Sequence, residues 1–165
     1  MDRLMKITAL FVLIVLAFVA FGFFFQKKEP EISGFSFANS VDENMNYVPS
    51  NGVYYPWEEM YFVMEISNLG MKNSGVSYKV DVEITNISGQ NPEKTFSETI
   101  LNETKSIDNK DGRISVFGRI NVPSGAKLGT NSIKITVTDL FSNSKKSIQK
   151  SFRVEEWTEK VNDLP

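Results

Sequence analysis

The chain contains neither histidine nor cysteine. Without histidine it lacks the commonest catalytic base and the commonest ligand of transition metals. Without cysteine it has no disulfide framework and no thiolate chemistry. Basic clusters are scarce too, because 18 Lys and Arg accompany 20 Asp and Glu, and no cluster exceeds a pair such as Lys145-Lys146. Since nucleic acid would need a basic stripe, the composition disfavours that partner.

Sequence motifs of catalysis are missing as well. The sequence has no Gly-rich phosphate loop, no nucleophile elbow and no pairing of a base with a nucleophile. Carboxylates, Lys and Tyr remain as acids and bases, but the sequence indicates no convergent polar cluster. We therefore expect a protein that is not an enzyme, with no catalytic residues, no cofactor, no metal and no evident small-molecule substrate.

What the chain does have is one long uncharged run, Ile7–Phe25, in which Thr8 is the only polar side chain. As a helix rising about 1.5 Å per residue, the run would span roughly 28 Å, close to the hydrocarbon core of a bilayer. A cleavable signal peptide is the competing interpretation, but its apolar region is usually about 7–15 residues long. A buried core helix is disfavoured because nothing else in the chain could surround it. We predict a transmembrane signal anchor over residues 7–25.

The flanks of this run determine the predicted topology. Lys and Arg are nearly balanced on its two sides, so the short N-terminus and the long following chain decide the orientation. We predict a cytoplasmic N-terminus over residues 1–6, a collar over 26–31, a domain over 32–157 and a flexible tail over 158–165. The protein would be a single-pass protein of the cell membrane, with its domain on the extracytoplasmic side.

The domain shows the period-2 alternation that is typical of half-buried strands. It is clearest over Tyr78–Thr85, where apolar side chains alternate with Lys, Asp, Glu and Thr. Further strands are expected near residues 60–67, 94–101, 114–122, 133–138 and 148–154, with a weaker one at 32–37. The polar stretch 38–52 is expected to be a loop, and 53–57 an edge segment that Pro56 interrupts. The core is predicted to contain Phe62, Met64, Ile66, Val80, Val82, Ile84, Ile135, Val137 and Phe152.

No helical periodicity occurs outside the anchor, so the crossover helices that parallel strands need are missing. We therefore predict an all-β fold, with about seven antiparallel strands in a two-sheet sandwich. Two stretches, 56–70 and 122–154, resemble the opening and closing strands of immunoglobulin-like domains of prokaryotic surface proteins. The chain departs from that pattern because Gly is missing before Glu58-Glu59 and no Tyr begins the strand at Ile133.

The resemblance implies an immunoglobulin-like (CARDB-like) extracytoplasmic domain behind an N-terminal membrane anchor. The layout of one N-terminal span and one outward sandwich is also similar to archaellum stator subunits. Two functions remain open. The domain is either a surface module that binds a protein or envelope component, or an accessory subunit of a larger membrane complex such as a pilus stator, transporter or hydrolase.

Four acidic segments are candidates for chemistry, and each has a simpler interpretation. Asp108–Gly112 fails as a calcium loop because Gly112 at position 6 would put Ile107 at position 1, so a hairpin turn is expected. Asp42-Glu43-Asn44 offers ligands for a hard cation, but it also suits a solvated loop. Glu58 and Glu59 are adjacent on a strand and should point to opposite faces. Asp139, at a strand end, is expected to be a turn residue.

Surface features are more informative about partners than about chemistry. Asn86 and Asn102 begin N-glycosylation sequons. The aromatic group Tyr54, Tyr55, Trp57 and Tyr61 is the best candidate for partner contact, because exposed aromatic residues anchor interfaces. The alternative interpretation of this group is packing at the edge of the core.

Overall fold

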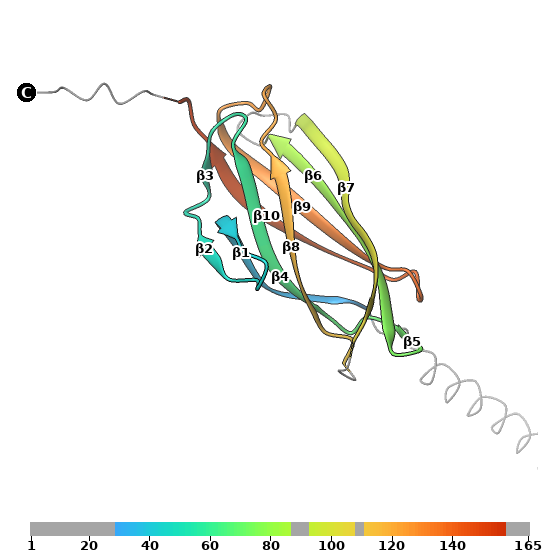
Figure 1. The fold of residues 1–165 in the computed structure, drawn as a ribbon. Coiled ribbons are helices and arrows are strands. Elements are labelled where there is room, and N and C mark those ends of the chain that lie inside the picture. Colours follow the sequence, from blue (N-terminus) through green and yellow to red (C-terminus); the bar gives the residue numbers. More distant parts are fainter. Residues whose placement is uncertain (1–28, 87–92, 108–110, 158–165) are drawn as a thin grey trace, which may run out of the picture.

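The computed structural model describes residues 29–86, 93–107 and 111–157, and these form ten β-strands (Figure 1). The strands are β1 (Glu31–Val41), β2 (Tyr47–Pro49), β3 (Val53–Tyr54), β4 (Glu59–Ser67), β5 (Met71–Lys72), β6 (Gly75–Asn86), β7 (Glu93–Ser106), β8 (Ile114–Asn121), β9 (Gly129–Asp139) and β10 (Lys145–Val154). Within these ranges there is no helix of the length and apolarity that a membrane crossing requires. The predicted anchor Ile7–Phe25, the N-terminus 1–6, the first half of the collar (26–28) and the tail 158–165 lie outside the described residues.

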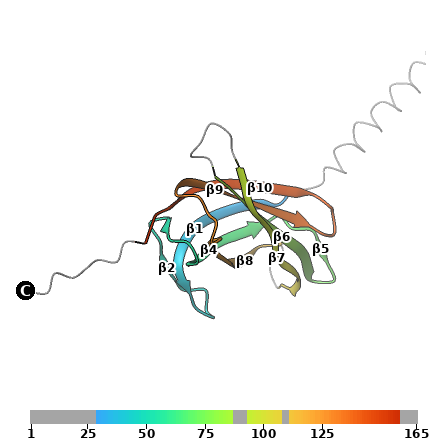
Figure 2. The same cartoon turned by 90° about the horizontal axis from the view of Figure 1, so that it is seen from above.

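The strands form two sheets that face each other across one core (Figure 2). The four-stranded sheet has the order β2-β1-β4-β8, and the six-stranded sheet has the order β3-β10-β9-β6-β5. β7 pairs with β6 along the side opposite to β9. Buried side chains from both sheets belong to one hydrophobic cluster. The prediction of an all-β fold with two sheets is confirmed.

The alternation of apolar and polar residues along each strand explains which residues form the core. In β6 the side chains of Val80, Val82 and Ile84 are buried, whereas the charged residues between them are partly exposed. This is the expected result of a strand whose apolar face meets the opposite sheet. All nine residues predicted for the core are at most 4% exposed, so the predicted register is confirmed.

Several predicted boundaries were wrong. Residues 38–52 are not one loop, because β1 continues to Val41 and β2 follows. The prediction of antiparallel pairing throughout fails at one place, where Val53-Tyr54 of β3 runs parallel to Arg153-Val154 of β10. A crossover helix is unnecessary there because the two segments lie about a hundred residues apart, with most of the domain between them. β7 also continues five residues beyond its predicted end, to Ser106.

Candidate functional site

The four aromatic residues predicted to contact a partner do not form one surface. Tyr54 is fully buried, and its ring packs edge-on against Phe37 and Phe152, with centroids 6.0 and 6.1 Å away. Burial is also the main reason why the pKa of Tyr54 lies above its usual value. The structure therefore removes Tyr54 from the predicted contact set and places it in the core.

Tyr55 and Trp57 lie at the end of the domain where β4 begins. The ring of Tyr55 packs against Trp157 with centroids 5.1 Å apart, and Trp57 and Trp157 are 74% and 70% exposed. Trp57 has a positive φ of 74°, and its N–H donates to the carbonyl of Val122 at 3.0 Å. All three aromatic residues lie at this end of the domain, and we call them the end cluster.

Tyr61 lies elsewhere, on the outer face of the four-stranded sheet. Its hydroxyl donates to Glu59 at 2.5 Å, and Arg119 of β8 pairs with the same carboxylate at 3.5 Å. The hydrogen bond to Glu59 raises the pKa of Tyr61, mainly because it favours the protonated phenol. Glu58 has a different partner, since its carboxylate accepts from the N–H of Tyr55 at 2.8 Å. The two adjacent glutamates therefore do not converge on one point.

Tyr61 is next to the feature that we consider the candidate site, the free edge of β8. β8 is the last strand of its sheet and pairs with β4 alone. At its end the N–H of Val122 donates to the carbonyl of Glu58 at 2.9 Å. Ladder bonds alternate along an antiparallel pair, so the N–H and C=O groups of Ser115, Phe117 and Arg119 point away from β4. β8 therefore presents a row of backbone donors and acceptors at the sheet edge.

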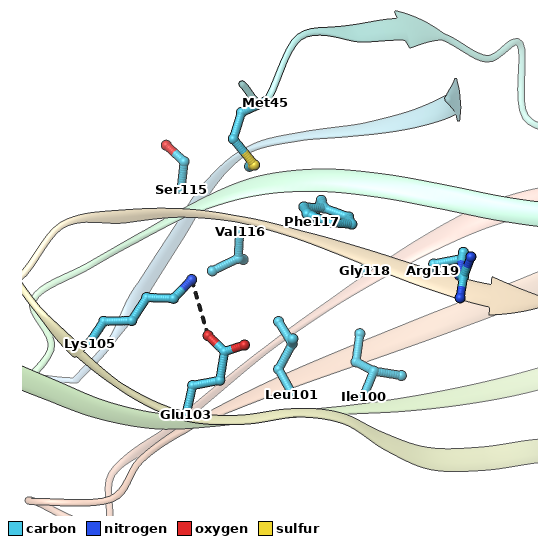
Figure 3. Close-up of a pocket in the computed structure, with 10 residues that line it drawn as sticks. All are labelled: Met45, Ile100, Leu101, Glu103, Lys105, Ser115, Val116, Phe117, Gly118 and Arg119. Carbon is cyan, nitrogen blue, oxygen red and sulfur yellow. Dashed lines mark ion pairs between the residues drawn. The ribbon is translucent and has the colours of Figure 1, made fainter. Parts of the chain in front are cut away.

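Two hollows flank this edge. The first, of about 330 Å³, lies between β8 and β7, and Figure 3 shows Ile100 and Leu101 pointing from β7 toward β8. The second, of about 230 Å³, lies on the outer face of the sheet and is lined by Met45, Tyr47, Val63 and Glu65, among other residues. Phe117 is 41% exposed and lines the first hollow. The edge thus combines backbone hydrogen-bonding groups with apolar surface on both sides.

One wall of the hollow between β7 and β8 is polar. Glu103 pairs with Lys105 at 3.0 Å, and the hydroxyl of buried Tyr78 donates to the same carboxylate at 3.0 Å (Figure 3 shows the ion pair). The hydrogen bond from Lys105 is the largest cause of the lowered pKa of Glu103. Burial, followed by the bond to Glu103, raises the pKa of Tyr78. At neutral pH this wall carries a compensated charge pair and a neutral phenol.

The acidic side chains Asp42 and Asp139 accept hydrogen bonds from the backbone of their own loops. Asp42 accepts from the N–H groups of Asn44 and Asn46 at 2.9 and 2.8 Å, and the bonds from Asn46 lower its pKa. Asp139 is fully buried at a strand end and accepts from its own turn, as predicted for a turn residue. Among the described residues, no three His, Cys, Asp or Glu side chains are placed to hold a metal ion. Of the Asp108–Gly112 segment, residues 108–110 lie outside the description, and Gly112 has a positive φ of 57°.

The two sequon asparagines are in contrasting places. Asn86 is 5% exposed, and its side-chain N–H groups donate to Asn131 at 3.2 Å and to the carbonyl of Lys127 at 3.3 Å. The folded domain therefore does not present Asn86 to a modifying enzyme. Asn102 is exposed on β7.

Neither a protein-family profile nor a curated protein matches this chain. Solved structures match it at low identity. The alkylpurine DNA glycosylase AlkC of Pseudomonas fluorescens covers 78% of the chain with a TM-score of 0.50 and 8% identity. The C-terminal domain of wzt covers 82% with a TM-score of 0.50 and 7% identity. The chain spans 31% of the glycosylase chain and 78% of the wzt domain. At these identities the similarity concerns the fold alone.

Proposed function

We propose that this protein is a membrane-anchored, extracytoplasmic, immunoglobulin-like module that binds a protein or envelope component and does no chemistry. The uncharged run Ile7–Phe25 supports the anchor, and the two-layered all-β domain is compatible with an immunoglobulin-like sandwich. The free edge of β8 is the observation that supports binding.

The partner adds an extended segment to β8. A strand beside β8 would satisfy the outward backbone groups of Ser115, Phe117 and Arg119, which is the usual source of affinity in β-strand addition. Side chains of such a strand alternate between two faces. One set would enter the hollow beside Ile100 and Leu101, and the other would enter the hollow on the outer face, which Met45, Tyr47 and Val63 line. The two hollows therefore supply sequence specificity.

Photocrosslinking from the β8 edge tests this proposal. A photoreactive amino acid replaces Phe117 in the full chain, within the membranes of its own host. The control position is Lys134, which is exposed on β9 in the other sheet. We expect a discrete crosslinked product from position 117 and none from position 134. Equal products from both positions would exclude β8 as the binding edge.

A backbone variant then separates strand addition from side-chain contact. Ser115→Pro removes an outward N–H without removing a ladder bond to β4, and proline is tolerated at strand edges. Ser115→Ala removes the hydroxyl and retains the N–H. We expect Ser115→Pro to abolish the crosslink and Ser115→Ala to retain it, with both variants melting near the unmodified protein. If Ser115→Pro crosslinks normally while folded, the partner does not extend the sheet.

The end cluster favours the second candidate function, an accessory subunit of a larger membrane complex such as an archaellum or pilus stator, a transporter or a hydrolase. Trp57 and Trp157 are the two most exposed large hydrophobic residues in the described part of the chain, and exposed aromatics anchor interfaces. A module with two separate contact surfaces suits a complex with more than one neighbour. Crosslinking from position 57 should then trap a different protein from the one trapped at position 117, and a single shared product would favour the simple module.

A further inference from the structure

The turn between β9 and β10 has an apolar tip. Leu140 and Phe141 are adjacent in this turn and are 38% and 43% exposed. Turn positions usually carry Gly, Pro, Asn, Asp or Ser, so two consecutive large apolar side chains are unusual there. The tip therefore exposes hydrophobic surface that the fold does not need for its own core.

The tip is held rigidly by the residue before it. The carboxylate of Asp139 accepts from the N–H of Phe141 at 2.8 Å and from the hydroxyl and N–H of Ser142 at 2.7 and 3.3 Å. The N–H of Leu140 donates to the carbonyl of Ser77 at 2.9 Å. Because these bonds fix the turn, Leu140 and Phe141 cannot readily fold back onto the domain.

This turn lies at the end of the domain where the described chain begins. Asp139 also accepts from the N–H of Gly70 at 2.7 Å, in the segment that follows β4. The start of β1 is at the same level, because Glu31 pairs with Ser67, the last residue of β4. Figure 1 shows the start of β1 (blue), β5 and the β9–β10 turn together at one end. Met71 of β5 adds a third apolar side chain there, 40% exposed.

The sequence keeps this end close to the predicted anchor. Three residues lie between Phe25 and Glu29, so even a fully extended connection of four Cα-to-Cα steps reaches at most about 14 Å. Exposed lysines accompany the apolar tips, since Lys72 follows Met71 and Lys145-Lys146 begin β10. Glu31 and Asp111 are exposed acidic groups at the same end. Apolar side chains with lysines beside them are the composition that binds the headgroup region of an anionic bilayer.

We propose that Leu140, Phe141 and Met71 insert into the headgroup boundary of the membrane that holds the anchor, with the lysines against anionic lipid. This inference rests on the proposed membrane anchor. It adds a second contact with the bilayer, which fixes the tilt of the domain and the height of β8 above the surface. The lysines lie beside the tips, where snorkelling ammonium groups can reach lipid phosphates.

Because the chain has no cysteine, one introduced thiol can be labelled without background. The test uses full-length Phe141→Cys carrying an environment-sensitive fluorophore, reconstituted into phosphatidylcholine vesicles with and without phosphatidylglycerol. Full-length Leu128→Cys is the matched control, because Leu128 is 51% exposed and precedes β9 at the opposite end. Both labels are titrated with a spin-labelled lipid and, separately, with aqueous iodide.

We expect spin-labelled lipid to quench the label at position 141 severalfold more than the label at 128, and iodide to show the reverse order. Quenching at 141 should increase with phosphatidylglycerol. Vesicle flotation, measured first, reports on the anchor itself. If the protein floats and the two labels behave alike, the membrane contact of the tip is excluded while the anchor stands. If the protein does not float, both proposals fail.

A second variant tests the same contact without a label at the tip. Leu140→Ser combined with Phe141→Ser changes two side chains that lie outside the hydrophobic core cluster, so the fold should persist. In that background a label at Met71→Cys should lose most of its quenching by spin-labelled lipid while flotation is unchanged. Undiminished quenching at position 71 would show that the β9–β10 tip does not hold this end against the bilayer.

Discussion

Gly118→Ala should destabilise the domain far more than an ordinary Gly→Ala change in a strand. Gly118 lies on the inward face of β8, and a Cβ built there would be 2.2 Å from Cζ of Phe62 and 2.6 Å from Cδ1 of Ile100. Optimal carbon–carbon contacts are about 3.5–4.0 Å, so an added methyl group needs more than 1 Å of displacement. Phe62 is fully buried and stacks on Phe35 with centroids 5.8 Å apart, which limits its movement.

The expected magnitude follows from this crowding. Overpacking a core typically costs about 1–3 kcal/mol, and a clash with a confined ring belongs at the upper end, about 3 kcal/mol. Ala relieves about 0.5–1 kcal/mol of the conformational cost of Gly in a strand, which leaves about 2 kcal/mol. For a domain of this size each kcal/mol lowers Tm by about 2–6 °C, so we expect a decrease of about 8 °C.

The measurement is thermal unfolding of the full chain in detergent, followed by tryptophan fluorescence. Gly125→Ala is the matched control, because no atom lies within 4 Å of its Cβ position. Phe62→Leu introduced with Gly118→Ala should restore part of the loss, since it removes the atoms that clash. If Gly118→Ala melts like Gly125→Ala, or if the double variant is simply the sum of the two single variants, the close contact of β8 with the core is wrong.

Three further outcomes are expected. Val82→Asp should unfold the domain by placing an unpaired charge between the sheets at a cost of several kcal/mol, whereas Thr85→Asp on the other face should shift Tm little. Thermal melts followed by circular dichroism compare the Tm values of the two variants, and equal values would contradict the register. Burial alone would raise the pKa of Asp139, but the hydrogen bonds from Gly70 and from its own turn together outweigh burial and lower the pKa. The contribution of Asp139 to stability is therefore complete above the unfolded pKa of about 3.9 and is lost as pH falls through the lower folded pKa. Asp139→Asn should therefore be less stable at neutral pH and should flatten the acid limb of Tm against pH, and an unchanged limb would contradict this role. In a host that glycosylates such sequons, Asn102→Gln should lower the mass of the protein by one glycan, and an unchanged mass would show that Asn102 is unused.

The alternation of apolar and polar residues within single strands made most of the fold predictable from the sequence. The segment Tyr78–Thr85 has one apolar face and one charged face, so its burial pattern follows from period 2 alone. The parallel pairing of β3 with β10 was missed because nothing near Val53 in the sequence indicates a partner at Arg153. Such pairings depend on how the whole chain is routed, which local patterns do not encode.

The candidate site was only partly predictable, for the same reason. Tyr54 and Tyr55 are neighbours in the sequence, but Tyr54 ends β3 with its side chain buried in the core, whereas Tyr55 follows the strand and packs on Trp157. Asn86 belongs to a sequon, yet its side chain is committed to Asn131, 45 residues later. One local signal was available for β8, since Phe117 interrupts the polar face of the strand.

The other sheet edges show why β8 is the edge to expect a partner on. Sheet edges invite pairing with other chains, and natural proteins protect them by shortness or by charge. β2 and β3 have three and two residues, and β7 carries the ion pair of Glu103 and Lys105 as well as exposed Glu98. β8 has eight residues with Phe117 at its middle, and the charge of Arg119 is paired with Glu59. A long edge with this little protection favours aggregation unless another chain covers it, and this is the physical basis for our proposal that a partner binds along β8.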